Sequence, residues 1–343
     1  MQGHTAAFLI KYRLSMLKIA ALLPHTEVFG GVRRYIEIGN EFVRRGHEFT
    51  LFTPSGEPPS WLPFRGGSMA FAALPGLAFD IGLCSEYSIL DRFDGLRASR
   101  KYFYFVLEGH KLEREVVRRG FHFLGNSEGL CRRIERRYGV VCRRAPGGVN
   151  TEIFHPLDPA ERPARPPGEF SVLCYGRVTK RRKGIPLVVK AVERLRRRHP
   201  GLRLIFFDSL VGEDRRDPRS LIKTSVPHEF HLDLPQSRMA WLFGRAGAFV
   251  SAEKRAGWAN TAAEAMACRL PVVCTPSGSR DFALPGKTAL VVPLRSPYFI
   301  ASALRRLIED RSLADRLAEA GFRKIGEFTW PSLAARLESY FRE

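Results

Sequence analysis

Residues 170–207 have the sequence FSVLCYGRVTKRRKGIPLVVKAVERLRRRHPGLRLIFF. An apolar run at the start is followed by a basic loop, by helical spacing of apolar residues from Ile185 to Arg198, and by a second apolar run, LRLIFF. The tripeptide HPG at 199–201 favours the end of the helix before that second run. Apolar strands separated by a helix are typical of a parallel sheet buried on both faces. The segment therefore predicts a strand–helix–strand unit.

The same pattern occurs near the start of the chain and again toward its end. At the start, the apolar run KIAALLP (18–24) is followed by a turn-rich loop, by helical spacing from Val32 to Val43, and by HEFTLF (47–52). Toward the end, AFVS, a helix around 262–268, PVVCT and ALVVP continue the alternation. We therefore expect an α/β fold with two similar halves, each with a parallel sheet.

A proline-rich segment separates the two halves. Residues 156–168 contain five prolines, a density that favours an extended chain and opposes both helix and sheet. We therefore expect a first domain over 16–155, a linker over 156–168 and a second domain over 169–327. Residues 1–15 are expected to be an N-terminal extension outside the fold.

The charge balance is the unusual feature of the composition. The chain has 343 residues, with 55 Lys plus Arg against 35 Asp plus Glu and a formal net charge of +20. Such an excess suggests a polyanionic partner, which is nucleic acid, an acidic membrane surface or a phosphate-bearing substrate. Nucleic acid is the least favoured, because the excess is spread over both halves and basic residues are not interleaved with exposed aromatics. A composition of 45% hydrophobic and 26% charged residues excludes disorder, collagen and coiled coil.

Cysteine spacing and hydropathy bear on metal binding and compartment. The six cysteines form no CxxC pair and have no histidine at zinc-binding spacing. Most lie in apolar runs, which predicts buried free thiols in a reducing compartment. No apolar run reaches the ~18–20 residues that are needed to span a bilayer. We therefore expect a cytoplasmic protein without a metal site.

Three loops follow predicted strands and precede predicted helices, which is where a doubly wound sheet binds its ligands. The first contains Gly30 and Gly31, and paired glycines permit a ligand to approach the backbone closely. A plain turn explains this pair equally well. Neither GxGxxG nor a P-loop motif is present, so neither dinucleotide fingerprint nor P-loop chemistry is indicated.

The second loop, GRVTKRRKG, directly follows the strand that opens the second half. Arg177 and Lys183 bracket this loop, and their charges would neutralise a diphosphate bound there. For residues 180–182 a solvated run of charges is the simpler explanation.

The third loop, together with the helix that follows it, occupies residues 251–268. Gly257 and Asn260 precede the helix, which contains Glu264, and its carboxylate would accept hydrogen bonds from ribose hydroxyls. Alternatively, Thr261 and Glu264 form a TxxE capping box in which Glu264 only satisfies a backbone N–H. On this segment alone the two interpretations are equally good.

In combination, these motifs resemble the nucleotide-sugar glycosyltransferases of family 4, which have the GT-B fold. The resemblance rests on GRVTKRRKG, EAMACRLPVVCT and ALVVP in the second half and on GG, NSEGL (126–130) and GGVNTEIFHP (147–156) in the first. It implies two Rossmann-like parallel-sheet domains that face a cleft. FTWPSLAARLESYF resembles the family's terminal helix, which implies that residues 328–343 cross back to the first domain.

The resemblance also implies an activity and the residues that support it. A family 4 enzyme transfers a sugar from a nucleoside diphosphate sugar to a hydroxyl acceptor with retention of the anomeric configuration. His110 is the candidate catalytic residue, and Glu108 is the second candidate. A surface-loop histidine without a function is an equally good interpretation of His110. Donor contacts would fall on Gly30, Gly31, Glu253, Gly257, Asn260, Thr261 and Glu264, and catalytic contacts on His110, Arg177 and Lys183.

The predicted chemistry does not require a metal ion. Breaking the bond between sugar and phosphate leaves a diphosphate, so the enzyme must stabilise developing negative charge. Arg177, Lys183 and the helix N-terminus at Asn260 supply positive potential for that purpose. Paired carboxylates at metal-ligand spacing are missing from the sequence. We therefore predict catalysis without a metal ion or another cofactor.

The sequence departs from the family pattern at two points. The family has two glutamates with seven residues between them, and Ala256 occupies the first of these positions here. Glu253 would substitute for that glutamate if the loop bends. The Arg177–Lys183 spacing is also one residue longer than is common in the family. The leading alternative is therefore a catalytically impaired GT-B protein that binds a nucleotide or acts as a scaffold.

The segment 111–144 bears on the acceptor because it is rich in arginine. Leu130, Ile134 and Tyr138 share one face of its predicted helix. Such a helix lies on an anionic membrane, or it is a core helix with a solvated outer face, and the second interpretation is favoured because the apolar residues are few. A lipid-linked or envelope glycan acceptor would suit a peripheral position at the inner face of the plasma membrane. We therefore expect a role in cell-envelope or surface polysaccharide synthesis, with a hexose or deoxyhexose as the transferred sugar.

Overall fold

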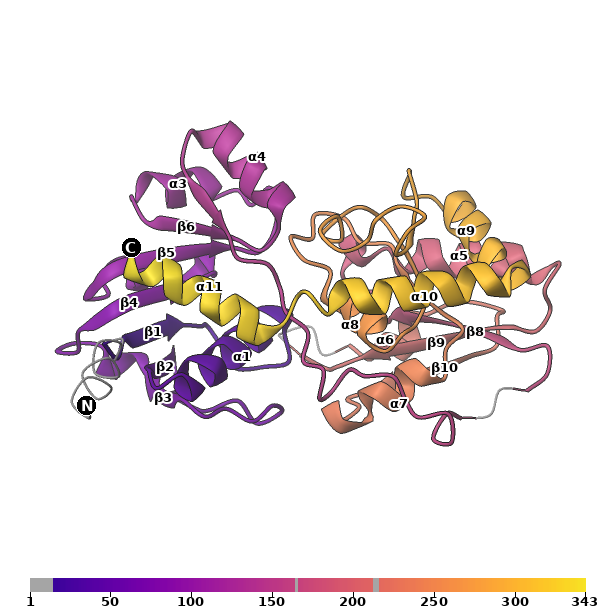
Figure 1. The fold of residues 1–343 in the computed structure, drawn as a ribbon, viewed down its shortest axis with the longest axis horizontal. Helices are drawn as coiled ribbons and strands as arrows, with labels where there is room; N and C mark the ends of the chain where they lie inside the picture. The colour runs from indigo at the N-terminus through magenta and orange to yellow at the C-terminus, as the bar shows by residue number, and fades with distance from the viewer. Residues whose placement is uncertain (1–14, 164–165, 212–215) are drawn as a thin grey trace, which may run out of the picture.

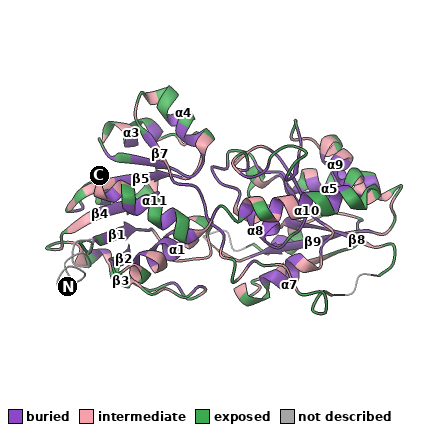
Figure 2. Ribbon diagram, in the orientation of Figure 1, coloured by how far each residue is buried: buried purple, intermediate pink, exposed green. Residues whose placement is uncertain are grey.

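The computed structural model describes residues 15–163, 166–211 and 216–343. Two α/β units lie side by side, each built on one parallel sheet (Figure 1). Residues 1–14 of the predicted N-terminal extension and residues 164–165 of the predicted linker lie outside the described residues. Buried residues concentrate in the strands and on the inner sides of the helices, while the outer sides of the helices are exposed (Figure 2).

The first sheet has seven strands in the order β3-β2-β1-β4-β5-β6-β7. Within this sheet, β1 pairs in parallel with β2 and β4, with Ile19 opposite Phe49 and Ile81. The strands are β1 (Lys18–Leu22), β2 (Glu48–Thr53), β3 (Gly67–Ala70), β4 (Phe79–Cys84), β5 (Ala98–Phe105), β6 (His122–Gly125) and β7 (Cys142–Arg144). The helices of this unit are α1 (Gly30–Arg44), α2 (Leu90–Asp94), α3 (Glu113–Arg118) and α4 (Glu128–Tyr138), with short 3-10 turns at Phe71–Ala73 and Tyr87–Ile89.

The second sheet has six strands in the order β10-β9-β8-β11-β12-β13, and it is also parallel. The strands are β8 (Phe170–Tyr175), β9 (Leu202–Asp208), β10 (His228–Leu232), β11 (Ala248–Ser251), β12 (Val272–Cys274) and β13 (Leu290–Val291). The helices are α5 (Ile185–Arg196), α6 (Pro218–Leu221), α7 (Met239–Gly244), α8 (Asn260–Ala267), α9 (Pro297–Glu309) and α10 (Arg311–Ile325), with 3-10 turns at Arg181–Lys183 and Gln236–Arg238.

The apolar runs form strands because both faces of each sheet are covered. In β8, Val172 and Cys174 pack into one hydrophobic cluster, while Leu173 between them packs into another. Successive side chains of a strand point to opposite faces, so a strand covered on both sides must be apolar throughout. The helix predicted over 185–198 is α5, which ends two residues earlier. The α/β fold with two parallel sheets is therefore confirmed.

Helix α4 has its apolar side in the core. Ser127 caps its N-terminus by accepting a hydrogen bond from the N–H of Leu130, and Gly139 ends it in the left-handed conformation with φ of 69°. Leu130 and Ile134 are buried in a cluster of the first unit, while Arg132, Arg136 and Arg137 are exposed. This arrangement is that of a core helix with a solvated outer face.

Helix α11 (Trp330–Arg342) lies on the first unit although it follows the second unit in the chain (Figure 1). Leu333 and Leu337 pack into the same cluster as the residues of β1, and Phe341 stacks on Phe42 of α1 at 5.6 Å between ring centroids. The two chain segments that cross between the units run together, because Val149 forms a parallel bridge with Thr329.

The two units also contact each other through loops. Leu107 of the first unit forms an antiparallel bridge with Ala256 of the second. The flanking hydrogen bonds run from the N–H of Glu108 to the carbonyl of Arg255 at 3.3 Å and from the N–H of Gly257 to the carbonyl of Val106 at 3.2 Å. A backbone pairing of this kind fixes the two loops in register, so it sets how the units face each other.

A second link between the units is centred on the buried Asp281. Its carboxylate accepts hydrogen bonds from the N–H of Glu128, at the start of α4, and from the guanidinium of Arg144, each at 3.1 Å. An acidic side chain at a helix N-terminus is favoured by the orientation of the helix dipole. This contact therefore ties α4 of the first unit to the second unit.

Two further expectations concern the state of the cysteines and the presence of a membrane-spanning helix. All six cysteines are free and buried, as their positions in apolar runs predicted. Within the ranges that the structure describes, no helix is both long and apolar enough to cross a membrane.

Candidate functional site

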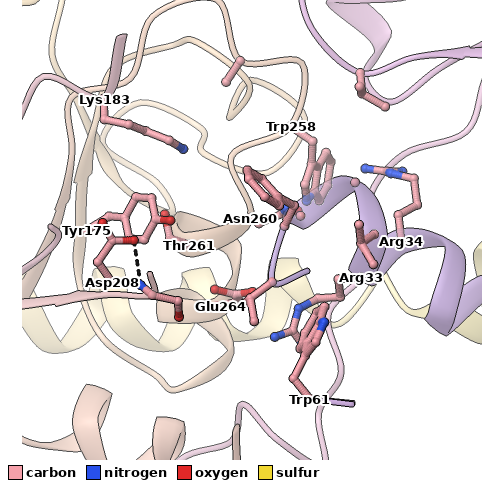
Figure 3. Close-up of a pocket in the computed structure, with 18 of the residues that line it drawn as sticks. Arg33, Arg34, Trp61, Tyr175, Lys183, Asp208, Trp258, Asn260, Thr261 and Glu264 are labelled. Atoms are coloured by element: carbon pink, nitrogen blue, oxygen red, sulfur yellow. Dashed lines mark hydrogen bonds between the residues drawn. The ribbon is translucent and has the colours of Figure 1, made fainter. Parts of the chain in front are cut away.

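A cleft with a volume of about 410 Å³ lies between the two units (Figure 3). Its walls come from loops that follow strands β1, β2 and β4 of the first unit and strands β8, β9 and β11 of the second. Parallel strands bring their carboxyl ends to one edge of a sheet, and here the two edges face each other. Of the predicted site residues, Gly30, Gly31, Lys183, Glu253, Asn260, Thr261 and Glu264 line this cleft.

The N-termini of α1 and α8 face each other across the cleft. A Cβ atom added at Gly30 would lie 2.2 Å from the side-chain nitrogen of Asn260, so this position admits only glycine without a shift of Asn260. Neither helix has a side-chain cap or an acidic residue in its first turn. Their first-turn N–H groups have no partner within a helix, so both point positive potential toward the same space.

Glu264 lies in α8, directly behind that N-terminus. The helix begins at Asn260 and shows no side-chain capping hydrogen bond, so the TxxE capping box that Thr261 and Glu264 suggested is not formed. Burial raises the pKa of Glu264, although Arg33 and Lys183 oppose the shift. The described residues include no hydrogen-bond donor to this carboxylate, which leaves its oxygens able to accept hydrogen bonds from a ligand.

Lys183 and Glu253 meet at the second unit's side of the cleft. The Lys183 ammonium donates to the Glu253 carboxylate, which is buried, and it lies 5.1 Å from the centroid of the Tyr175 ring. Arg182 is 4.0 Å from the same carboxylate. Glu253 therefore pairs with two cations of the basic loop, Lys183 and Arg182.

Arg177 is buried beside the cleft and does not line it. Its guanidinium donates to the Asp208 carboxylate at 2.7 and 3.0 Å and to the carbonyl of Ser209 at 2.8 Å. Asp208 and Ser209 do line the cleft, and Arg177 lines a smaller neighbouring pocket. Because Asp208 balances its charge, Arg177 holds the end of β9 in place and supplies little potential to the cleft.

Gly257 lies in the contact between the units and is not part of the cleft wall. A Cβ atom at this position would approach the side-chain oxygen of Asn126 to 2.2 Å and the carbonyl of Val106 to 2.5 Å. The resemblance implied a donor contact at Gly257, and the structure shows that the groups close to this glycine belong to the first unit.

His110 lies away from the cleft. Its ring stacks on Tyr87 at 3.7 Å between centroids with an angle of 14°, and its Nδ1 accepts a hydrogen bond from the N–H of Leu112 at 3.2 Å. Burial lowers the pKa of His110, and Lys111 lowers it further. The second candidate, Glu108, pairs through its backbone with Arg255. The structure therefore does not bring either residue together with Lys183 and Glu264.

Several cleft residues were not predicted from the sequence. Asp208 ends strand β9 and Glu86 follows strand β4 by two residues, so a search for polar residues after every strand would have found both. Arg33 and Arg34 follow the glycine pair within α1, where periodicity alone marks them as helical. Trp61 belongs to the long loop after β2, and no motif indicated it.

The geometry suits a ligand with both negative charge and hydroxyl groups. Two helix N-termini and Lys183 converge on one space, which favours an oxyanion such as a phosphate. The Glu264 carboxylate lies next to this space and can accept hydrogen bonds from hydroxyls. The indole of Trp61, held by a hydrogen bond from its Nε1 to the carbonyl of Thr26 at 2.8 Å, forms part of the first unit's wall.

Comparison with protein families and characterised sequences gives a consistent result. Residues 160–324 match the family model described as glycosyl transferases group 1. A D-inositol 3-phosphate glycosyltransferase from Arthrobacter sp. (strain FB24) is 31% identical over 208 residues, which cover 57% of this chain and 49% of that protein. A capsular polysaccharide biosynthesis glycosyltransferase, CapM, from Staphylococcus aureus is 25% identical over 184 residues, covering 51% of this chain and 47% of that protein. The chain thus spans about half the length of these two curated relatives.

Solved structures resemble the chain over almost its whole length. Sucrose-phosphate synthase from Thermosynechococcus elongatus superposes with a TM-score of 0.77 and 18% identity, covering 95% of this chain and 98% of that one. HepE from Anabaena, solved in complex with UDP-glucose, superposes with a TM-score of 0.75 and 14% identity, covering 95% and 99%. At these identities the likeness shows the fold, and the predicted GT-B architecture is confirmed.

The buried Glu264 carboxylate gives a prediction for stability against pH. Its pKa in the folded protein lies above the ordinary value near 4.5, so the stability of the fold falls as the pH rises from the ordinary pKa to the folded pKa. We expect Glu264→Gln to raise the melting temperature by a few degrees at pH 7–8. The gain should disappear below the ordinary pKa, where both states hold a protonated carboxyl. Melting curves from pH 4 to pH 8 measure the difference.

The matched control for this experiment is Glu57→Gln, an exposed carboxylate outside the cleft. It should leave the melting temperature unchanged at every pH. An equal gain for Glu264→Gln at pH 4 and pH 8 would show that ionisation of Glu264 is not the cause.

Proposed function

Because residues 160–324 belong to the group 1 glycosyl transferases, we propose that the chain transfers a sugar from a nucleoside diphosphate sugar to a hydroxyl acceptor with retention of the anomeric configuration. The observation that carries the proposal is the convergence of the α1 and α8 N-termini and Lys183 on one cleft between the units. Such convergence is suited to a diphosphate, which is the leaving group of this reaction.

In the proposed donor complex, the second unit holds the nucleoside diphosphate. The Lys183 ammonium and the first-turn N–H groups of α8, at Asn260 and Thr261, stabilise the negative charge that develops as the bond to the sugar breaks. The Glu264 carboxylate accepts hydrogen bonds from the ribose hydroxyls. Gly30 and Gly31 close the cleft from the first unit and add the N–H groups of α1.

Three predicted residues take different roles in this proposal. Arg177 positions Asp208 and Ser209 at the cleft edge, because its Nε and one terminal nitrogen donate hydrogen bonds to them. Glu253 sets the position of the Lys183 ammonium through their ion pair. Gly257 keeps the two units close enough for both helix N-termini to reach one ligand.

The acceptor would enter from the first unit, whose wall includes Trp61 and Glu86. We propose a glycan or lipid-linked acceptor in cell-envelope or surface polysaccharide synthesis, with a hexose or deoxyhexose as the transferred sugar. The capsular polysaccharide enzyme among the relatives supports this class of product. A cytoplasmic location, with peripheral contact to the inner face of an anionic membrane through the arginine-rich 111–144 segment, is part of the same proposal.

Ala256 supports a second candidate function, a GT-B protein that binds a nucleotide without turnover. Ala256 presents only a methyl group to the cleft at the position where the family has its first glutamate. Glu253 also lines the cleft, and its carboxylate is engaged by Lys183. The two functions differ in whether a bound donor is consumed.

A donor panel tests the proposed function and separates it from the alternative. We expect one class of UDP-, GDP- or dTDP-sugar to bind and to be hydrolysed slowly or transferred, at a rate that EDTA does not change. Metal independence is expected because fixed positive groups supply the potential that a cation would supply. Calorimetry measures binding, and detection of the released nucleoside diphosphate measures turnover.

The outcomes of the panel are distinct. Binding of a donor without release of nucleoside diphosphate would support the scaffold function. Loss of activity in EDTA that Mn²⁺ or Mg²⁺ restores would contradict catalysis without a metal ion.

A pair of variants tests which of the predicted catalytic residues act in the cleft. We expect Lys183→Met to lower kcat by about 10²–10³-fold, the range for loss of one group that stabilises developing charge. Lys183→Arg should retain more of the activity than Lys183→Met. We expect His110→Ala to keep kcat within about threefold, because groups that act in proton transfer contribute about 10²–10⁴-fold and His110 lies outside the cleft.

Initial rates with a saturating donor measure both effects, and melting curves establish that each variant is folded. A loss of activity in His110→Ala as large as in Lys183→Met would mean that the His110 loop moves to the cleft during turnover, contrary to the proposed site.

A further inference from the structure

Arg34 is a buried cation in the wall of the cleft. Its side chain projects from α1 at the fifth residue of the helix, and only 2% of the residue is exposed. One terminal nitrogen donates to the hydroxyl of Tyr104 at 2.6 Å, and the guanidinium carbon lies 4.8 Å from the centroid of the Tyr104 ring. Arg34 lines the cleft despite its burial, so its remaining accessible surface faces that space.

Arg34 differs from the other buried arginine among the described residues, Arg177, because it lacks a carboxylate partner. Within the described ranges, Arg177 pairs with Asp208, and the half-buried Lys183 and Arg133 pair with Glu253 and Glu113, but Arg34 forms no ion pair. Burying a charge is unfavourable unless it is paired. Among the described residues the Tyr104 hydroxyl is the one hydrogen-bond partner of the Arg34 guanidinium, so a further anion would stabilise it. The cleft is the space from which that anion can come.

The surroundings of Arg34 reinforce the positive potential. No acidic residue occupies the first turn of α1, and Arg33, the preceding residue, has a buried terminal nitrogen with no hydrogen-bond partner. Glu86, an acidic wall residue from the first unit, lies by Gly31, and burial raises its pKa, which favours the neutral form. The α1 side of the cleft is therefore suited to an oxyanion.

We propose that Arg34 binds an oxyanion, a phosphate or a carboxylate, that is carried by the acceptor. This inference rests on the proposed function and names the class of its acceptor substrate. Lys183 and Arg34 lie on opposite sides of the cleft, with Asn260 and Glu264 between them (Figure 3). The donor diphosphate occupies the Lys183 side in the proposed complex, so the charge at Arg34 is available to the acceptor, which enters from the unit to which Arg34 belongs.

Matched acceptors test the proposal. The probes are glucose and glucose 6-phosphate, and methyl glucoside and methyl glucuronide, offered with the donor that the panel identifies. We expect the anionic member of at least one pair to be used about tenfold or more better in kcat/KM, the change that one hydrogen bond to a charged group produces. Arg34→Met should abolish that preference and leave kcat/KM for the neutral member within about threefold. Arg34→Lys should keep part of the preference.

The control variant is Arg44→Met, which removes the same charge from the same helix at an exposed position outside the cleft. It should keep the preference for anionic acceptors. The melting temperature of Arg34→Met without ligand should equal or exceed that of the natural protein, because the substitution removes an unpaired buried charge. If Arg34 only stabilises the fold, both Arg34→Met and Arg34→Lys should have lower melting temperatures and keep the preference for anionic acceptors. That result would overturn the proposal.

A second measurement identifies the source of the oxyanion. Calorimetry with the nucleoside diphosphate alone should give affinities within about threefold for the natural protein and Arg34→Met. A tenfold or greater loss in Arg34→Met, with the acceptor preference unchanged, would assign Arg34 to the donor diphosphate and overturn the acceptor proposal.

A different set of results is expected if the chain does not transfer a sugar. In that case no nucleoside diphosphate sugar would bind or be consumed, and calorimetry with glucose 6-phosphate against glucose would test Arg34 directly. Binding of the phosphate ester that Arg34→Met abolishes would support the oxyanion site without the transfer reaction. Equal affinity of Arg34→Met and the natural protein for the phosphate ester would overturn the site itself.

Discussion

The antiparallel pairing of Leu107 with Ala256 is the contact on which the rest of the site depends. It holds the carboxyl edges of two sheets opposite each other, and it requires Gly257 because a side chain there would meet Asn126 and Val106 of the first unit. Once the loops are paired, the N-termini of α1 and α8 face one cleft. Position 256, where the resemblance to family 4 implies a glutamate, holds a domain contact and a methyl group in this chain.

The charges of the cleft divide into those that the protein balances and those that it leaves for a ligand. Asp208 neutralises Arg177, which does not line the cleft, whereas Lys183 lines the cleft and Glu253 sets the position of its ammonium. Glu264 and Arg34 are buried without an ion-pair partner among the described residues. Unpaired buried charge weakens the folded protein, and it persists at sites where a ligand compensates for it. The net charge of +20 is therefore weak evidence for the kind of ligand that the chain binds, since only a few cations face the cleft.

The sequence was sufficient to predict the fold because its signals are local. Apolar runs, helical spacing and terminal glycines indicated β1, α1, β8 and α5 to within a few residues, and the alternation of strands and helices then placed the loops at the carboxyl edges of parallel sheets. The site was predicted less completely, because its contacts join residues far apart in the chain. Nothing local indicates that Asp208 will neutralise Arg177, that His110 will stack on Tyr87, or that Arg34 will be buried without a carboxylate. The predicted capping box is not formed because α8 begins at Asn260, which places Thr261 inside the helix.

The most direct test of whether both units form one ligand site is amide hydrogen exchange, measured with and without the nucleoside diphosphate that the chain binds. We predict that saturating nucleotide slows exchange together in residues 30–34 of α1 and in residues 255–264, which include the paired loop and the start of α8. Protection confined to the second unit would contradict a composite site built from two opposed helix N-termini.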